Sequence, residues 1–420
     1  MPIADIPNLQ SLLAGRTPGH SLPAAFYRSE EVFRADLDLI FSRHWIYVGV
    51  EPDVTEPGDV MRVDIGEASI LIVRDDDMMV RAFHNVCRHR GAQLVTDEKA
   101  TVGNLVCRYH SWTYDLTGTL LFADHMGPDF DKSCHGLKPV HVRSMAGLLF
   151  VCLAKEPPAD FDAMAEAMTP YVAPHDIPNT RIIKTIDIIE EGNWKLTMEN
   201  NRECYHCGAN HPELTVPLFA YGFGFAPETL DAVEREQADR YAGMVKERHA
   251  HWESCGLPSR EIEHLADRVT GFRTERLPID QSGESQTMDT RAASKKLLGR
   301  INDPRAGGLS FWTQPNSWHH FMADHVVTFS VLPLGPEKTL LRTKWLVHKD
   351  AREGIDYDPD IVTQVWEATN LQDSSLVGLA QAGVVSPAYQ PGPYSPFTEG
   401  LVEKFCEWYV GRMTAGLAAA

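Results

Sequence analysis

Four side chains that can bind metal form two pairs in one stretch of this chain. Cys87 and His89 make a C-x-H pair, and Cys107 and His110 make a C-x-x-H pair. Two thiolates and two imidazoles on paired short loops are what a [2Fe–2S] cluster with one Cys₂ iron and one His₂ iron requires. Neutral imidazoles in place of two thiolates raise the reduction potential of such a cluster. The motif therefore predicts a redox protein.

Zinc binding and simple burial are the alternative interpretations of these residues. Paired Cys and His residues often hold zinc, and free cysteines often behave as small buried hydrophobes. Zinc knuckles, however, usually combine C-x₂₋₄-C with H-x₃₋₅-H, whereas this motif opens with C-x-H. The spacing therefore favours the iron–sulfur cluster.

A second group with metal-binding chemistry lies between residues 199 and 212. Glu199, Glu203 and His206 occur at i, i+4 and i+7, so one helical face would carry all three. On an unbroken helix His211 would lie about 140° round from His206. The helix must therefore loosen if both imidazoles bind one ion, and Gly208 is well placed to permit this.

A third, anionic ligand is predicted on a helix over residues 360–381. Asp373 sits in the middle of the apolar stripe of that helix, where a carboxylate is costly unless it is paired or bound to a cation. His206, His211 and Asp373 would form a two-histidine, one-carboxylate site that leaves positions on Fe(II) open for dioxygen and water. Taken singly, either histidine could be a hydrogen-bonded interior residue, and Glu199 could be a helix-face acid or a group that supports a ligand.

Two cysteines bracket this second group. Cys204 and Cys207 form C-x-x-C, which could indicate a redox dithiol or a zinc pair, but no thioredoxin-like βαβ pattern surrounds them. The eight cysteines of the chain suggest no disulfide framework, so a reducing cytoplasm is the expected setting.

Hydrophobic patterning indicates how these groups are positioned. A helix is predicted over residues 29–43, capped by Ser29. Strand-like runs at 60–65, 70–73 and 80–83 predict a small antiparallel β domain around the cysteine motif. Further β runs, at 326–332 and 339–347, predict a twisted sheet, and the polar segment 281–296 is interpreted as a surface loop or a flap. We expect an N-terminal helical segment at 1–44, the β domain at 45–155 and a catalytic domain at 156–420.

Composition excludes several classes of function. A chain of 420 residues suits two domains or one domain with an insertion, and its formal charge of −19 argues against a nucleic acid partner. The longest apolar run, 145–154, is too short to span a membrane and predicts a buried strand. No export signal is visible at the N-terminus.

The two motifs, in this order, resemble those of the α subunits of Rieske non-haem iron oxygenases. The resemblance implies an α+β fold in which a Rieske [2Fe–2S] β domain is inserted into a helix-grip (START-like) catalytic domain with a twisted antiparallel sheet. It implies one [2Fe–2S] cluster on Cys87, His89, Cys107 and His110. It also implies one Fe²⁺ ion on His206, His211 and Asp373.

Three segments resemble the subgroup that acts on quaternary ammonium compounds, in particular on glycine betaine: residues 199–214, 126–131 and 389–395. The family usually has aspartate where this chain has Glu203, and the subgroup shares the glutamate. That residue links an iron histidine to a cluster histidine of the neighbouring subunit, which implies a homotrimer. The resemblance further implies an NADH-dependent reductase with flavin and [2Fe–2S] as partner. The implied reaction is O₂-dependent demethylation of glycine betaine to dimethylglycine and formaldehyde.

Binding of a quaternary ammonium ion requires aromatic faces and diffuse negative potential. Trp312, Trp318 and Phe321 are the candidates for such a cage, although ordinary core packing is an equally good interpretation of each. His319, His320 and His325 are candidates for contact with a substrate carboxylate.

Other activities remain open at this point. Proline betaine demethylation, carnitine oxidation and aromatic-ring dihydroxylation are alternatives within the family. A Rieske electron carrier or a zinc protein are alternatives outside it. A carrier would hold two irons per chain, whereas the oxygenase would hold three.

Overall fold

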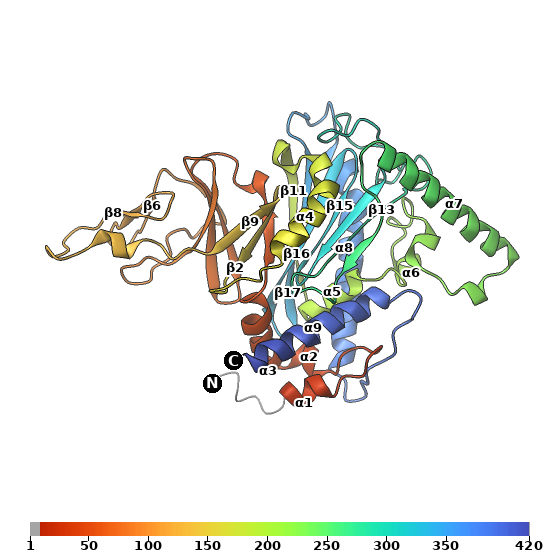
Figure 1. Cartoon of the computed structure of the whole chain (residues 1–420), viewed down its shortest axis with the longest axis horizontal. Coiled ribbons are helices and arrows are strands. Elements are labelled where there is room, and N and C mark those ends of the chain that lie inside the picture. The colour runs from red at the N-terminus through yellow and green to blue at the C-terminus, as the bar shows by residue number, and fades with distance from the viewer. Residues whose placement is uncertain (1–8, 420) are drawn as a thin grey trace. The chain divides into compact units, whose positions relative to one another are not determined.

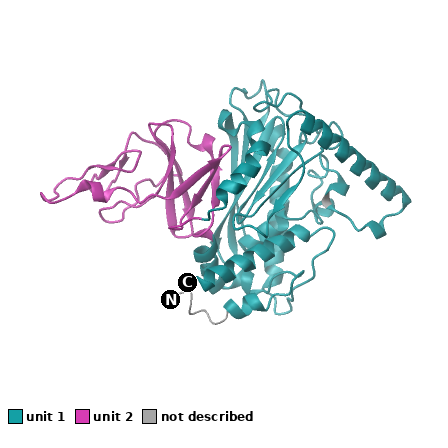
Figure 2. Cartoon of the chain, in the orientation of Figure 1, with its two compact units in different colours: residues 1–40, 158–420 teal, residues 41–157 magenta. Residues whose placement is uncertain are grey.

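The computed structural model describes residues 9–419, and the chain divides into two compact units (Figure 2). One unit comprises residues 41–157, and the other comprises residues 1–40 together with 158–420. The expected β domain, 45–155, falls inside the first unit. The first eight residues of the expected N-terminal segment lie outside the described residues.

The unit of residues 41–157 consists of three small antiparallel sheets (Figure 1). Their strand orders are β1-β10-β9, β4-β3-β2-β5 and β6-β7-β8. The strands are β1 (Ile46–Val50), β2 (Asp59–Ile65), β3 (Ala68–Arg74), β4 (Val80–His84), β5 (Lys99–Thr101), β6 (Leu105–Val106), β7 (Thr113–Tyr114), β8 (Leu120–Phe122), β9 (His141–Met145) and β10 (Leu148–Cys152). The three predicted strand runs are confirmed as β2, β3 and β4, and the apolar run at 145–154 contains the fully buried β10.

The other unit is built on a seven-stranded antiparallel sheet of order β11-β17-β16-β15-β14-β13-β12. Its strands are β11 (Thr180–Glu190), β12 (Ile262–His264), β13 (Phe272–Leu277), β14 (Gly308–Thr313), β15 (Ser317–Phe321), β16 (His325–Gly335) and β17 (Lys338–His348). The two predicted β runs are confirmed as the long central strands β16 and β17. Burial along most of β16 is continuous, as expected of a strand covered on both faces.

The α-helices of this unit lie against the sheet, beside its ends or beyond it (Figure 1). They are α1 (Leu9–Ala14), α2 (Ala25–Arg28), α3 (Glu30–Ala35), α4 (Phe161–Val172), α5 (Trp194–Asn201), α6 (Cys207–Asn210), α7 (Ala232–Ser254), α8 (Pro359–Val384) and α9 (Gly400–Ala418). The long helix α8 packs against β11 and α5, and it confirms the helix predicted over 360–381.

The helix predicted over 29–43 forms in two parts. Ser29 caps α3 as expected, because its side chain accepts from the backbone N–H of Val32. At Asp36 the backbone changes to a π-helical pattern that continues to Phe41. The buried Asp36 carboxylate there accepts hydrogen bonds from the Trp194 indole and the Tyr409 hydroxyl, which belong to α5 and α9.

The segment 281–296 is a packed loop, so its interpretation as a plain surface loop is wrong. Ser285, Thr287, Thr290 and Ser294 are buried. Their hydroxyls find partners inside the loop or on neighbouring elements, as when Ser285 donates to the Asp324 carboxylate at 2.7 Å. Small polar side chains can be buried when each is hydrogen-bonded, which composition alone does not reveal.

No helix among residues 9–419 combines the length and the apolar character that crossing a bilayer requires.

Candidate metal centres and the adjoining cavity

The two cysteine loops of the smaller unit have the same backbone hydrogen bonds. In each loop the cysteine N–H donates to the carbonyl five residues later: Cys87 to Ala92 and Cys107 to Trp112, both at 2.8 Å. In each loop the cysteine carbonyl also accepts from the N–H four residues later, that of Gly91 at 3.0 Å and that of Ser111 at 2.9 Å. Gly91 and Ser111 both have positive φ, of 77° and 59°. The sequence pairs therefore occupy two matching loops, which suits a cluster held between them.

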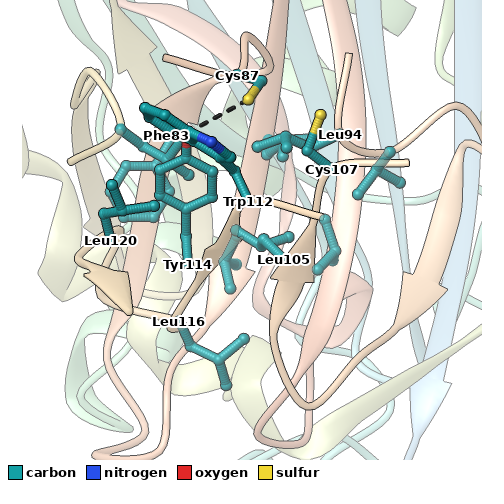
Figure 3. Packing of buried hydrophobic residues seen from close by; sticks show 14 residues of the cluster. Phe83, Cys87, Leu94, Leu105, Cys107, Trp112, Tyr114, Leu116 and Leu120 are labelled. Carbon is teal, nitrogen blue, oxygen red and sulfur yellow. Dashed lines mark hydrogen bonds between the residues drawn. The ribbon is translucent and has the colours of Figure 1, made fainter. Parts of the chain in front are cut away.

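The thiols of these loops face the interior and the imidazoles face outward. Cys87 and Cys107 belong to the hydrophobic cluster of this unit, and Figure 3 draws their sulfur atoms at the edge of its packed side chains. His89 and His110 are exposed, with ring centroids 4.5 Å apart. The His89 ring stacks on Trp112. This arrangement fits a cluster whose Cys₂ iron is buried and whose His₂ iron lies at the surface.

Tyr114 supports the buried sulfur. Its hydroxyl oxygen accepts the backbone N–H of Arg88 at 3.0 Å, and it lies 3.4 Å from Cys87 Sγ. Burial raises the pKa of the Cys87 thiol. A hydroxyl donor beside a ligating sulfur is one of the groups by which proteins adjust a cluster's reduction potential.

In the larger unit, three side chains from separate segments converge. His206 precedes α6, His211 follows it, and Asp373 lies on α8. Asp373 Oδ1 is 3.2 Å from His206 Nε2 and 3.0 Å from His211 Nε2. His211 Nε2 is buried, and no described residue hydrogen-bonds it. Two imidazole nitrogens and a carboxylate oxygen aimed at one point suit the donor set expected for a non-haem iron.

Hydrogen bonds at the far ring nitrogens orient both imidazoles. His206 Nδ1 lies 2.5 Å from Glu203 Oε1, and His211 Nδ1 lies 2.8 Å from Gln372 Oε1. Because oxygen acceptors hold a proton on Nδ1, each Nε2 is the ring atom that faces Asp373 and would be the one to bind a metal ion. Gln372 is held in turn by Glu213.

The charges of the three groups are coupled. Burial disfavours the charged form of His206, but hydrogen bonds to Asp373 and Glu203 outweigh it and raise the pKa of His206 to about 9. Burial opposes ionisation of Asp373 as well, yet the two histidines hold its pKa below the ordinary value. The site therefore stabilises a carboxylate beside positive charge, which a divalent cation would supply.

The helix break predicted in this segment occurs earlier than expected. We expected Gly208 to loosen a helix that carried Glu199, Glu203 and His206 on one face. Instead α5 ends at Asn201, and Gly208 lies within the short helix α6. Glu199 remains on α5 and accepts from the hydroxyl of Tyr27 at 2.9 Å. Glu199 therefore serves the helix packing, and of these two glutamates only Glu203 contacts the imidazole of His206.

Cys204 and Cys207 form a disulfide, contrary to the expectation that no cysteines would pair. The other six cysteines are free. Cys207 Sγ lies within 4.8 Å of the ligand atoms of His206 and His211, but its bond to Cys204 occupies the sulfur. Asp373 touches both histidines and is the better third ligand. The C-x-x-C spacing of these two cysteines is the signal for the disulfide that the sequence offers.

A cavity of about 200 Å³ adjoins the three convergent side chains. Besides them it is lined by residues of β14, β15 and α8, among them Trp312, His320 and Trp366. Of the three aromatic residues predicted to form a cation cage, only Trp312 lines it. The prediction for Trp318 and Phe321 is wrong.

Strand geometry explains both errors. Trp318 pairs with Trp312 in the β14–β15 register, but its ring stacks on Phe329, with centroids 4.8 Å apart, which covers it. Phe321 lies an odd number of residues from Trp318, so it faces the opposite side of the sheet, where it packs near His175. The Trp312 ring is itself approached by two guanidinium groups, those of Arg202 and Arg273, at 5.0 and 4.8 Å from its centroid. The Trp312 ring therefore already has two cations beside it.

Sequence reasoning missed Trp366 as a cavity residue. Its ring stacks on the imidazole of His320, with centroids 4.3 Å apart and planes within 15°. Trp366 lies seven residues before Asp373 on α8, which places both side chains on one face two turns apart. That spacing from Asp373 is the signal for Trp366 that the sequence offers.

Two family models match the chain. A model described as Rieske [2Fe–2S] domain matches residues 44–138, and one described as ring hydroxylating alpha subunit (catalytic domain) matches residues 177–415.

Known proteins are similar over nearly the whole length. The chain is 45% identical to the glycine betaine monooxygenase oxygenase subunit of Chromohalobacter salexigens over 97% of this chain and 89% of the relative. It is 40% identical to the subunit of the same name from Pseudomonas aeruginosa, over 97% and 92%. Among solved structures, a quaternary ammonium Rieske monooxygenase has a similar fold, with a TM-score of 0.71 at 20% identity over 96% of this chain and 98% of that one.

Proposed function

Because the chain belongs to the Rieske non-haem iron oxygenase α-subunit family, we propose that it is the oxygenase subunit of a glycine betaine monooxygenase. The observation that carries this proposal is the 40–45% identity, over almost the entire chain, to oxygenase subunits of that name. The proposed reaction consumes glycine betaine, O₂, two electrons and two protons. It hydroxylates one N-methyl carbon and forms water, and the hydroxymethyl product then splits into dimethylglycine and formaldehyde.

The proposal assigns a metal group to each set of convergent side chains. Cys87, His89, Cys107 and His110 would hold a [2Fe–2S] cluster, which supplies electrons one at a time. His206, His211 and Asp373 would hold a ferrous ion, which supplies the activation of dioxygen. The protein's own part is to orient these ligands, through Glu203 on His206 and Gln372 on His211.

The cavity supports a quaternary ammonium substrate. Trp366 and the stacked His320 offer aromatic surface among the lining residues. Burial lowers the pKa of His320 to about 3, so its imidazole stays neutral at physiological pH and does not repel a cation. A trimethylammonium group held against this wall would share one cavity with His206, His211 and Asp373.

A separate reductase and a trimeric assembly complete the proposal. The name "oxygenase subunit" of the relatives implies a partner that supplies electrons, for which we propose an NADH-dependent reductase carrying flavin and [2Fe–2S]. We also propose a homotrimer in which His110 of one subunit meets Glu203 of the next. Exposure of His110 and the unusual exposure of the neighbouring Tyr109 and Val106 support such contact.

The test is turnover by the purified trimer with NADH, O₂ and a reductase of that class. We expect formaldehyde and dimethylglycine in equal amounts from glycine betaine, three irons per chain and the visible colour of the cluster. Proline betaine, carnitine and choline are the comparison substrates. Faster demethylation of proline betaine or carnitine would contradict the substrate assignment, and absence of formaldehyde with every N-methyl compound would contradict the demethylase. Asp373→Ala is the inactive control, because it removes the proposed carboxylate ligand.

A further inference from the structure

One wall of the cavity carries a buried cation without a counter-charge. Arg202 follows α5, lines the cavity and is fully buried. Within the described part of the chain no carboxylate pairs with it, and its Nε–H has no acceptor. Its terminal nitrogens donate only to neutral oxygens: Asn201 Oδ1 at 2.8 Å, Gln314 Oε1 at 3.3 Å, and the carbonyls of Thr313 at 3.4 Å and Ser317 at 3.5 Å.

The neighbouring arginine differs in this respect. Arg273 donates from Nε to Glu261 at 2.8 Å and from a terminal nitrogen to Glu275 at 2.6 Å. Its positive charge is therefore matched by carboxylates. The Trp312 ring lies within 5.0 Å of both guanidinium groups, so the two arginines share one wall with an excess of positive charge contributed by Arg202.

A second donor on this wall also has no partner. The indole Nε1–H of Trp312 is buried, and no acceptor for it exists among residues 9–419. A buried donor without an acceptor costs free energy, and native proteins leave few of them. These two donors, Arg202 Nε–H and Trp312 Nε1–H, would both be satisfied by the oxygens of a bound carboxylate.

We infer that Arg202 and Trp312 form the subsite that recognises the carboxylate of the substrate. The inference rests on the proposed function and adds to it the reason for choosing a betaine over choline. Choline carries the same trimethylammonium group but ends in a neutral hydroxyl, which cannot neutralise Arg202. The wall of Trp366 and His320 would then hold the cationic group, and Arg202 would select its anionic end.

The electrostatics of Arg202 agree with this role. Burial, followed by repulsion from Arg273, lowers the pKa of Arg202 to about 9. The side chain is still charged at neutral pH, so the folded protein keeps an uncompensated cation at the cavity wall. A substrate anion would relieve this cost on binding.

Equilibrium binding to the purified full-length protein tests the inference. Three probes separate the two ends of the substrate: glycine betaine, choline, and tert-butylacetate, which keeps the carboxylate but replaces the cationic nitrogen by carbon. For the unaltered protein we expect glycine betaine to bind about 10- to 100-fold more tightly than choline, as one charge-assisted contact provides. We also expect tert-butylacetate to compete with glycine betaine. Equal affinity for glycine betaine and choline would overturn the inference without any variant.

Variants then assign the effect to Arg202. Arg202→Gln should weaken glycine betaine and tert-butylacetate by about 10- to 100-fold and change choline by less than about threefold. The matched control is Arg276→Gln. Arg276 is also a fully buried arginine that donates to backbone carbonyls, but it does not line the cavity. This control should leave the ratio of the glycine betaine and choline affinities unchanged.

A purely structural role for Arg202 makes a different prediction. If the side chain only holds the carbonyls of Thr313 and Ser317, Arg202→Gln will weaken all three probes equally, and the inference fails. Should that variant not fold, Arg202→Lys keeps the charge, and it must then retain a preference for glycine betaine over choline. If the unaltered protein prefers carboxylates but releases no formaldehyde, the proposed function fails and the subsite stands. If the unaltered protein demethylates glycine betaine but Arg202→Gln keeps the same preference for glycine betaine over choline, the proposed function stands and the carboxylate subsite fails.

Discussion

The carboxylate of Glu203 makes several contacts in this site. Its Oε1 lies against His206 Nδ1, and its Oε2 accepts backbone N–H groups of Tyr205 and His206. Glutamate is one methylene longer than the aspartate usual in the family, so its carboxylate can reach across a slightly different separation. The side chain therefore orients His206, the proposed iron ligand, and remains close to the exposed Tyr205, where we propose that the neighbouring subunit docks.

Replacing Glu203 by Gln should slow electron transfer more than it affects metal binding. The amide oxygen can still accept from His206, but the negative charge is lost. We expect oxidation of the reduced cluster by O₂ and substrate to slow by about 10- to 100-fold, while iron content stays at three per chain. Stopped-flow absorbance of the cluster measures this rate, and Glu228→Gln, on the surface, is the control. An unchanged rate would exclude Glu203 from the electron path.

The free energy of unfolding should depend on pH through the side chain of Glu190. It is buried at the end of β11, accepts from Thr197 and has one oxygen with no partner among the described residues. Burial is the main cause that raises the pKa of Glu190 from 4.5 to about 7. Folding thus favours the protonated acid. The stability that it contributes is full below about pH 4.5 and is lost as the pH rises through about 7.

The gain in stability of Glu190→Gln over the unaltered protein should therefore be larger at pH 8 than at pH 5. A shift from 4.5 to about 7 corresponds to a loss of up to about 3 kcal/mol between these limits. Thermal unfolding at both pH values measures the difference, with Glu166→Gln on the exposed face of α4 as control. Equal gains at both pH values would mean that ionisation of Glu190 is not the cause.

At the scale of elements, hydrophobic periodicity predicted which face of a helix or strand is buried, but not which residues pack against that face. The stripe on α8 identified Asp373 as an interior carboxylate because a charged residue among apolar ones stands out. Trp366 lies on the same stripe, yet an aromatic residue there looks like any core residue. Only the packing of α8 near His320 on β15 distinguishes a cavity wall from a core contact. Likewise, the run of aromatic residues on β14 and β15 predicted a cage, but the strand register decides which side chains face the cavity.

Trp366 provides the test of the cavity wall formed by α8. Trp366→Leu keeps an apolar side chain but removes the aromatic face that stacks on His320 and the indole N–H that donates to Gln286. We expect affinity for glycine betaine and for choline to fall together, by about 2- to 30-fold, because both carry the trimethylammonium group. Trp408→Leu is the matched control, since Trp408 is buried on α9 and its indole donates to the carbonyl of Val269. Loss of affinity in both variants alike would indicate general destabilisation.

At the scale of the whole chain, the change from helical to strand-like patterning predicted a small antiparallel β domain, whereas its insertion into a catalytic domain was implied by the resemblance to the family. Each unit has its own sheets and its own metal-binding residues, so local patterns carry most of the information about the fold. The C-x-H and C-x-x-H spacing predicted two paired loops, but their matching backbone hydrogen bonds are seen only in the structure. The disulfide at Cys204 and the end of α5 at Asn201 did not follow, because both depend on how the chain turns after the helix.

The exposed surface around His110 carries the last prediction, which concerns assembly. Val86, Val106 and Tyr109 surround the imidazoles and expose 44%, 46% and 56% of their area. Apolar side chains clustered beside a redox group favour contact with another protein surface. We propose that this surface, defined by these three residues and His110, docks on the neighbouring subunit near Glu203.

Val106→Asp should therefore weaken the trimer while the cluster stays intact, because the substitution puts charge into an apolar contact. We expect sedimentation to show monomers at concentrations where the unaltered protein is trimeric. The visible spectrum of the cluster should be unchanged, and glycine betaine turnover should fall at least about tenfold. Val233→Asp, an exposed apolar position on α7, is the control and should remain trimeric. Turnover that survives in a monomeric Val106→Asp protein would mean that electrons reach the catalytic site within one subunit.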